Sequence, residues 1–256
     1  MTTPTPNPID APQHILTLLD TLHKRSLEQE ATLSKPSSGG KIFSTDLVAD
    51  LNNNLSNETS ESSSSARNAF DALMLDKFIA LDADKCAFTY QLITAMSATN
   101  VIEAGTSFGV STIYLALAVG KVKSLTGRSG TVIATEKEVS KADVAKGYWA
   151  QCGKVVGDQI DLRVGDLLET LKSNLPSYGV DLLLLDIWSP LALPTLKLVQ
   201  PHFRPGAVVL TDNTISGAKG YADLLGYLRD PESGFRNMTL PFTNGFEMSV
   251  YMPASK

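Results

Sequence analysis

Short runs of apolar residues alternate with longer amphipathic segments through the last two thirds of the chain. The apolar runs predict strands over residues 100–104, 131–135, 160–164, 180–186 and 206–211. The segments around them have helical spacing and predict helices over residues 82–96, 109–119, 138–152, 166–173, 190–201 and 217–229. Strands that alternate with helices in this way form a parallel sheet with helices on both faces.

The C-terminal end breaks this alternation. Two extended runs, 235–241 and 246–252, flank the dipeptide Asn244-Gly245, and Asn-Gly between extended runs is a strong signal for a β-hairpin. The sequence therefore predicts an α/β fold with a seven-stranded, mostly parallel sheet whose last strand runs antiparallel.

The N-terminal third has a different character. Residues 1–9 are rich in Thr and Pro, residues 11–33 have the apolar spacing of an amphipathic helix, and residues 44–55 could form a short helix. Residues 57–65 are a polar, Ser-rich linker or the cap region of the next helix. We expect residues 1–78 to be a tail and a helical region that acts as a lid, a dimerisation element or a cover, and residues 79–256 to form the α/β domain.

Composition narrows the possible partners and compartment. The net charge of −5 and the absence of Lys/Arg runs argue against nucleic acid or an anionic membrane surface. Cys86 and Cys152 are far apart with no His at ligand spacing, so buried thiols are expected rather than a disulfide or zinc site. The start, MTTPTPNPID, lacks the features of a signal peptide and no run is long enough to span a membrane, so a cytoplasmic protein is expected.

The stretch VIEAGTSFGVS links the first predicted strand to the helix that follows it. Gly105 and Gly109 punctuate a strand-to-helix turn, the place where α/β sheets bind nucleotides. The spacing Glu-x-Gly-x-x-x-Gly fits neither the dinucleotide motif nor the phosphate loop. Glu103 would repel a phosphate but could accept the ammonium of an amino-acid moiety. The stretch resembles motif I of the S-adenosylmethionine (SAM) methyltransferases, and an ordinary turn with a surface Glu is the alternative.

The next two strand ends also carry carboxylates. Glu136 stands where an acidic residue can accept hydrogen bonds from two ribose hydroxyls. Asp166 could meet the adenine amino group, cap the helix that starts at Leu167, or do both.

Oxygen ligands follow the fourth and fifth strands. Asp186 comes directly after four leucines, and Asp212 and Asn213 follow the apolar run at 208–210. Adjacent strand ends would bring these three side chains together. Two carboxylates and an amide oxygen suit a hard cation, Mg²⁺ most naturally, with Ca²⁺ or Mn²⁺ possible. For Asp212 and Asn213 alone, ordinary turn chemistry is the alternative.

Together these segments resemble the metal-dependent small-molecule O-methyltransferases of the catechol and caffeoyl-CoA type, over about residues 79 to 254. The resemblance implies the Rossmann-like fold of class I methyltransferases, a cytoplasmic homodimer and SAM as methyl donor. It implies cofactor contacts from the following residues: Glu103, Gly105, Gly109, Ser111 and Glu136, with Asp166 and Asp186 beside them. It also implies a metal held by Asp186, Asp212 and Asn213.

Two further positions concern the acceptor. The resemblance puts Trp188 in the place of a tryptophan that packs on the substrate, although a Trp after a buried strand can also belong to the core. Ser189 stands where the family usually has a lysine taken as the general base, and a serine hydroxyl cannot remove a phenolic proton unaided at neutral pH. Acidification of the hydroxyl by the metal is the favoured explanation. Lys85, Lys219, the metal-binding carboxylates and water are the candidate proton acceptors.

We therefore expect methyl transfer from SAM to a catechol-like phenol, with the metal binding its vicinal oxygens and Asp186, Trp188, Ser189 and Asn213 lining the reaction site. A hydroxylated metabolite other than a catechol, or SAM binding without turnover, are the alternatives. A nicotinamide-dependent reductase is disfavoured because the chain has no Tyr-x-x-x-Lys pair and its glycine spacing is wrong.

Overall fold

The computed structural model describes residues 7–33, 75–177 and 179–253. Seven strands form one sheet in the order β3-β2-β1-β4-β5-β7-β6. Their bounds are β1 (Asn100–Ala104), β2 (Thr131–Glu136), β3 (Ile160–Val164), β4 (Val180–Leu185), β5 (Phe203–Asp212), β6 (Phe235–Leu240) and β7 (Phe246–Tyr251). The first five strands are parallel, and β7 lies between β5 and β6, antiparallel to both. The predicted class I methyltransferase fold, with its antiparallel last strand, is confirmed.

The helices match the predicted ones with several differences in length. They are α1 (Gln13–Leu33), α4 (Ala83–Ala95), α5 (Val110–Thr126), α6 (Val139–Cys152), α7 (Lys154–Gly157), α8 (Leu167–Thr170), α9 (Ser189–Val199) and α10 (Ala222–Arg229). The predicted end of α5 at residue 119 was wrong, because the helix passes through Gly120, buries Val122 and ends at Gly127 in the left-handed conformation. The short α7 was not predicted, and α8 and α10 are shorter than expected.

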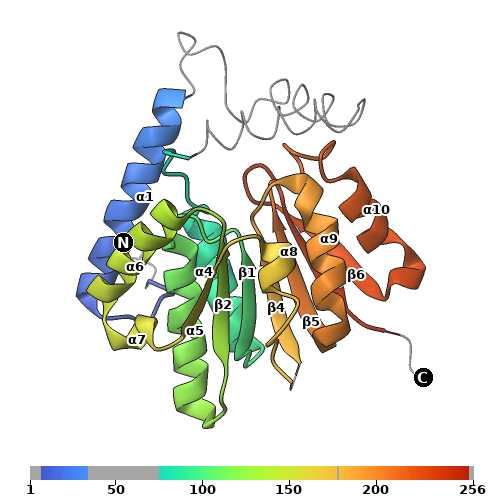
Figure 1. The fold of residues 1–256 in the computed structure, drawn as a ribbon, viewed down its shortest axis with the longest axis horizontal. Coiled ribbons are helices and arrows are strands. Elements are labelled where there is room, and N and C mark those ends of the chain that lie inside the picture. Colours follow the sequence, from blue (N-terminus) through green and yellow to red (C-terminus); the bar gives the residue numbers. More distant parts are fainter. Residues whose placement is uncertain (1–6, 34–74, 178, 254–256) are drawn as a thin grey trace, which may run out of the picture.

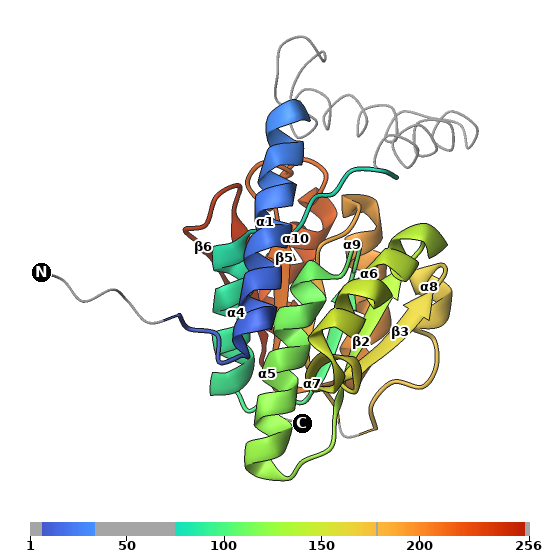
Figure 2. The same ribbon diagram turned by 90° about the vertical axis from the view of Figure 1, so that its left-hand side faces the viewer.

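The two faces of the sheet pack against different helices (Figures 1 and 2). Helices α1, α4, α5, α6 and α7 share one hydrophobic core with alternate residues of the central strands, whereas α8, α9 and α10 share the other. Leu182 and Leu184 face the first core, and Leu183 and Leu185 face the second. This explains why β4 is a continuous apolar run: a parallel strand that is covered on both faces has no solvent-facing side.

Helix α1 lies across α5 and α6 on the outside of the first layer (Figure 2). It buries Ile15, Leu19 and Leu22, and its His23 imidazole is 2.9 Å from the Tyr114 hydroxyl. The predicted short helix at 44–55 and the polar segment at 57–65 lie outside the described residues. Within the described ranges, no helix combines the length and the apolar character that crossing a bilayer requires.

A buried carboxylate ties three strands together where the parallel strands begin. Asp181 in β4 accepts hydrogen bonds from the backbone N–H groups of Thr99 and Asn100, at 2.8 and 2.9 Å, and it is ion-paired with Arg204 of β5. The side chain of Asp181 is almost fully buried, so the ion pair and the two hydrogen bonds replace its lost hydration. We refer to this arrangement as the Asp181 clamp. It lies at the N-terminal ends of β1, β4 and β5, opposite the carboxyl ends of these strands.

Candidate functional site

The turn between β1 and α5 has a backbone that only glycine can adopt without strain at two positions. Gly105 has φ of 94° and Gly109 has φ of 77°. A Cβ atom on Gly105 would lie 2.1 Å from the carbonyl oxygen of Asp186, because the turn presses against the end of β4. Gly109 caps α5, and its carbonyl accepts a hydrogen bond from the Trp149 indole at 3.0 Å. The turn therefore places backbone without side chains at the carboxyl ends of β1 and β4.

Glu103 lies beneath this turn and has no solvent-exposed surface. Its carboxylate accepts hydrogen bonds from three hydroxyls, those of Ser111 and Thr112 at 2.6 Å and that of Thr106 at 2.8 Å. Burial raises the pKa of Glu103, and the three hydroxyl donors oppose that rise. The Glu103 oxygens face the hydroxyls of the chain and hold the start of α5 in place. A contact of Glu103 with the ammonium of a ligand stays a prediction. The Ser111 hydroxyl is bound to Glu103 inside the protein.

Glu136 ends β2 and lies beside the same turn. Its carboxylate accepts the backbone N–H of Ser107 at 2.7 Å and that of Glu138 at 2.8 Å. It is 8% exposed, so it reaches the surface of the site while it fixes the turn. Asp166, at the end of β3, is exposed and caps α8 by accepting the N–H of Leu168 at 2.9 Å. The capping role is observed, and a contact of Asp166 with adenine stays a prediction.

The three oxygen-bearing side chains expected at β4 and β5 do lie on neighbouring strand ends. Leu185 pairs with Thr211, so Asp186 and Asp212 follow directly from paired positions. Burial raises the pKa of Asp186 well above its usual value, and the nearby negative charges of Asp212 and Glu103 raise it further. Asn213 has φ of 59°, a left-handed conformation that Asn tolerates better than most residues, which explains the Asp-Asn pair at this turn.

A cation from the protein already lies in this cluster. The Lys85 ammonium of α4 is 2.6 Å from Asp212 Oδ1 and 2.8 Å from Asp82 Oδ2, and Lys85 is fully buried. Burial lowers the pKa of Lys85, but the charges and hydrogen bonds of Asp212 and Asp82 outweigh it, so the pKa is raised and the side chain stays charged. Lys85 is therefore not the proton acceptor that the sequence allowed. Its pairing with Asp212 joins positions 127 residues apart, and no spacing in the sequence signals it.

The donor set does not fit a divalent cation in this arrangement. One oxygen of Asp212 is bound by Lys85, and the other accepts the Asn213 side-chain amide at 2.9 Å. Mg²⁺ needs carboxylate and amide oxygens directed at one point, whereas here an ammonium and an amide N–H face the carboxylate. The predicted residues are thus brought together, but in a cluster whose charge is balanced by a lysine.

The acceptor-side residues lie in the loop after β4. Trp188 is the N-cap residue of α9, and Ser189 is the first residue of that helix. The Tyr221 hydroxyl donates a hydrogen bond to the carbonyl of Ile187 at 3.2 Å and holds this loop against the turn after β5. Lys219, the other lysine considered as a proton acceptor, is exposed.

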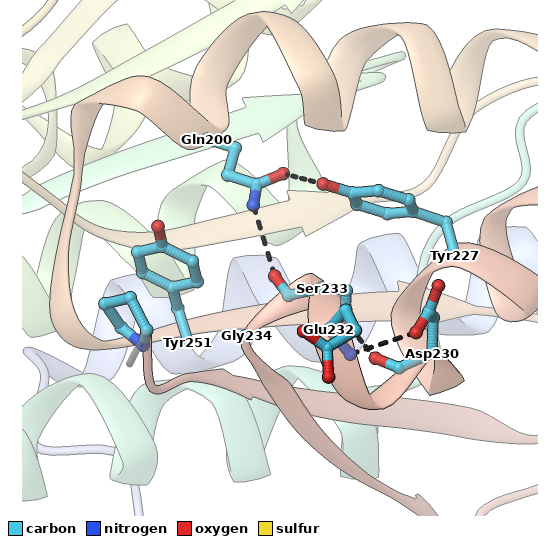
Figure 3. Close-up of a pocket in the computed structure, with 8 residues that line it drawn as sticks. Gln200, Tyr227, Asp230, Glu232, Ser233, Gly234 and Tyr251 are labelled. Atoms are coloured by element: carbon cyan, nitrogen blue, oxygen red, sulfur yellow. Dashed lines mark hydrogen bonds between the residues drawn. The ribbon is translucent and has the colours of Figure 1, made fainter. Parts of the chain in front are cut away.

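A pocket of about 380 Å³ lies near the start of β5, the start of β6 and the end of β7, away from the carboxyl ends of the parallel strands (Figure 3). Its walls come from the ends of α9, α10 and β7 and the start of β6, and they consist of Gln200, Tyr227, Asp230, Glu232, Ser233, Gly234, Tyr251 and Pro253. The Tyr227 hydroxyl donates to Gln200 Oε1 at 2.7 Å, so two of its polar groups satisfy each other. This pocket is remote from the predicted cofactor and acceptor residues.

The chain is similar to methyltransferases in sequence and in fold. Residues 102–214 match a family model described as a methyltransferase domain. A catechol O-methyltransferase of Mycobacterium tuberculosis (strain ATCC 25618 / H37Rv) is 32% identical over 149 residues, which cover 58% of this chain. The match spans 63% of that relative, less than two thirds of its length.

Solved structures share the fold. The cofactor-bound structure of Rv0187 from MTB has a TM-score of 0.59 and 25% identity, covering 69% of this chain and 83% of that one. An O-methyltransferase from Bacillus cereus in complex with SAH has a TM-score of 0.55 and 22% identity, covering 67% and 82%. At this identity the second likeness concerns the fold alone. These matches confirm the resemblance to O-methyltransferases that the sequence motifs predicted.

Proposed function

We propose that the chain transfers a methyl group from SAM to a hydroxyl of a phenolic small molecule, because residues 102–214 match a methyltransferase-domain model and the fold is that of solved O-methyltransferases. A catechol-like phenol is the acceptor that the resemblance favours. The observation that carries the proposal is the meeting of the 105–109 turn, Glu136 and Asp186 at one edge of the sheet. The Asp186 N–H donates to the carbonyl of Ala104 at 3.0 Å, and Glu136 holds Ser107, so all three elements are linked.

The residues of this edge fit SAM by their chemistry. Gly105 and Gly109 leave backbone uncovered, and Glu136 presents an acceptor for ribose hydroxyls. Asp166 is exposed at the next strand end, where it can meet the adenine amino group. Asp186 borders the turn, and Glu103 and Ser111 act indirectly by holding the start of α5. Glu136 places a partly exposed carboxylate beside the turn, and a positively charged sulfonium favours such negative surroundings.

Bound SAM would supply a methyl group on positively charged sulfur for transfer to the acceptor oxygen. Ser189 cannot take the acceptor's proton near neutral pH, and the Lys85 ammonium is held in ion pairs with Asp82 and Asp212. Water, Lys219 and the carboxylates at the ends of β4 and β5 are the remaining proton acceptors. A phenol with a pKa near ~10 ionises far more readily than an alcohol, which supports a phenolic acceptor. Trp188 lies in the loop after β4, and packing on the ring of the acceptor is the role that the resemblance gives it.

Two measurements on the full chain test this proposal. Calorimetry should show SAM binding that Glu136→Gln weakens, with Glu138→Gln as the matched control on a neighbouring carboxylate whose side chain lies outside the turn contacts. Methyl transfer from radiolabelled SAM to a panel of catechols and simple phenols should then give a methyl ether. Absence of SAM binding by the wild-type chain would contradict the proposal.

A second function is favoured by Ser189. Without the usual lysine at that position the chain could bind SAM and not transfer its methyl group. Tight SAM binding together with no product from the whole panel would select this reading. We also propose that the protein is cytoplasmic and that it forms a homodimer. Sedimentation velocity of the full chain would test the dimer.

A further inference from the structure

Lys85 is the one described lysine whose whole side chain is buried at the end of the sheet where the acceptor is expected. It lies in the first turn of α4, its ammonium touches carboxylates of both α4's N-cap and β5, and it lies 5.9 Å from the ring centre of Phe246. A buried ammonium is costly unless charged partners replace its hydration. Asp82 and Asp212 are those partners, so the lysine is built into the site.

The ammonium contacts Asp212, one of the two carboxylates that a divalent cation at the ends of β4 and β5 would need. Its charge acts on Asp212 by direct contact, at 2.6 Å from Asp212 Oδ1. A metal held by the same two carboxylates would lie within a few ångströms of a fixed positive charge. Each oxygen of Asp212 is moreover occupied, one by Lys85 and one by Asn213.

We propose that the Lys85 ammonium takes the place of a divalent metal ion at the ends of β4 and β5, so that this site works without one. Lys85 is then a positioning residue: it holds Asp212 and balances the charge of the carboxylates that border the acceptor. A consequence that rests on the proposed function concerns the acceptor class. With no metal to chelate two vicinal oxygens, a phenol with a single hydroxyl is as suitable as a catechol.

Metal binding by the full chain tests the proposal without any turnover. Mn²⁺ is the probe, because it takes oxygen ligands and its electron paramagnetic resonance signal reports the free ion. The wild-type protein should show no saturable Mn²⁺ binding up to about 1 mM, the weak end of affinities for hard cations in protein sites. Saturable binding by the wild type that Asp212→Asn abolishes would overturn the proposal, whatever the variants of Lys85 do.

Removal of the lysine should create the metal site. Lys85→Met keeps most of the apolar stem and frees Asp212, so Mn²⁺ affinity should rise at least about tenfold, and Asp212→Asn in the same background should remove the gain. Lys121→Met is the matched control, because it removes a lysine charge from the exposed face of α5 and should leave Mn²⁺ binding unchanged. A folded Lys85→Met protein with no gain in Mn²⁺ binding would also overturn the proposal.

The result is separable from the proposed function. SAM binding measured in EDTA tests the methyltransferase assignment and does not involve Lys85. If SAM fails to bind, the proposed function fails, while the Mn²⁺ titration still decides whether the lysine or a metal ion occupies the cluster. If SAM binds and methyl transfer stops in EDTA and returns with Mg²⁺, the proposal about Lys85 is wrong and the proposed function stands.

Discussion

Replacement of Gly105 by alanine should be among the most damaging single changes at the candidate site. The added Cβ would lie 2.1 Å from the Asp186 carbonyl oxygen and 2.7 Å from Ile187 Cγ2, and φ of 94° is unfavourable for any residue with a side chain. Backbone strain of this kind costs about 1–3 kcal/mol. Overpacking against neighbours that cannot move adds about 1–3 kcal/mol. The free energy of unfolding should therefore fall by about 2–6 kcal/mol in total.

Gly127→Ala is the matched control for this change. Gly127 also has positive φ, at 69°, but a Cβ there would meet no atom within 4 Å. The free energy of unfolding of Gly127→Ala should fall only by the cost of backbone strain, about 1–3 kcal/mol. Urea unfolding of both variants, followed by circular dichroism, measures the difference, and calorimetry should show that Gly105→Ala also weakens SAM binding. Equal losses of stability in the two variants would refute the close approach of the turn to β4.

Three further changes probe other parts of the molecule. Trp149→Phe removes the donor to the Gly109 carbonyl and should cost about 1–3 kcal/mol in urea unfolding, with weaker SAM binding. Asp181→Ala leaves buried backbone N–H groups without an acceptor and should cost about 2–4 kcal/mol while SAM affinity, measured on the folded protein, is unchanged. Burial raises the pKa of Cys152 to about 11 from 9.0, so the unfolded chain loses its thiol proton first as pH rises; stability should fall between pH 9 and 11, and Cys152→Ala should flatten that fall.

Much of the fold could be predicted because its signals are local. The strand at 100–104 and the strand at 160–164 were predicted with the observed bounds. The first is buried along its whole length, and the second alternates apolar and polar residues at the edge of the sheet, which are two local strand signals. The length of α5 was underestimated: the predicted helix ended at residue 119, whereas the observed helix passes through Gly120 and buries Val122. Burial in a tertiary contact outweighs the weak helix propensity of one glycine.

The site was harder to predict than the fold. Neighbouring strand ends brought Asp186, Asp212 and Asn213 together as expected, because parallel strands place their carboxyl ends at one edge. The sequence did not reveal that Glu103 faces inward, although hydroxyls three, eight and nine residues later were a local signal for it. The partner of Asp212 depends on how α4 packs on the sheet, which periodicity does not specify.

The Asp181 clamp holds β1, β4 and β5 together at a place distant from the turn at Gly105. Its charges and hydrogen bonds act at the start of β1, β4 and β5, a full strand length from the candidate chemistry. Stabilising substitutions where the strands begin should therefore not disturb the candidate site. The stability that they add can offset the cost of substitutions in the loops at the opposite ends of the strands, where the choice of acceptor would change.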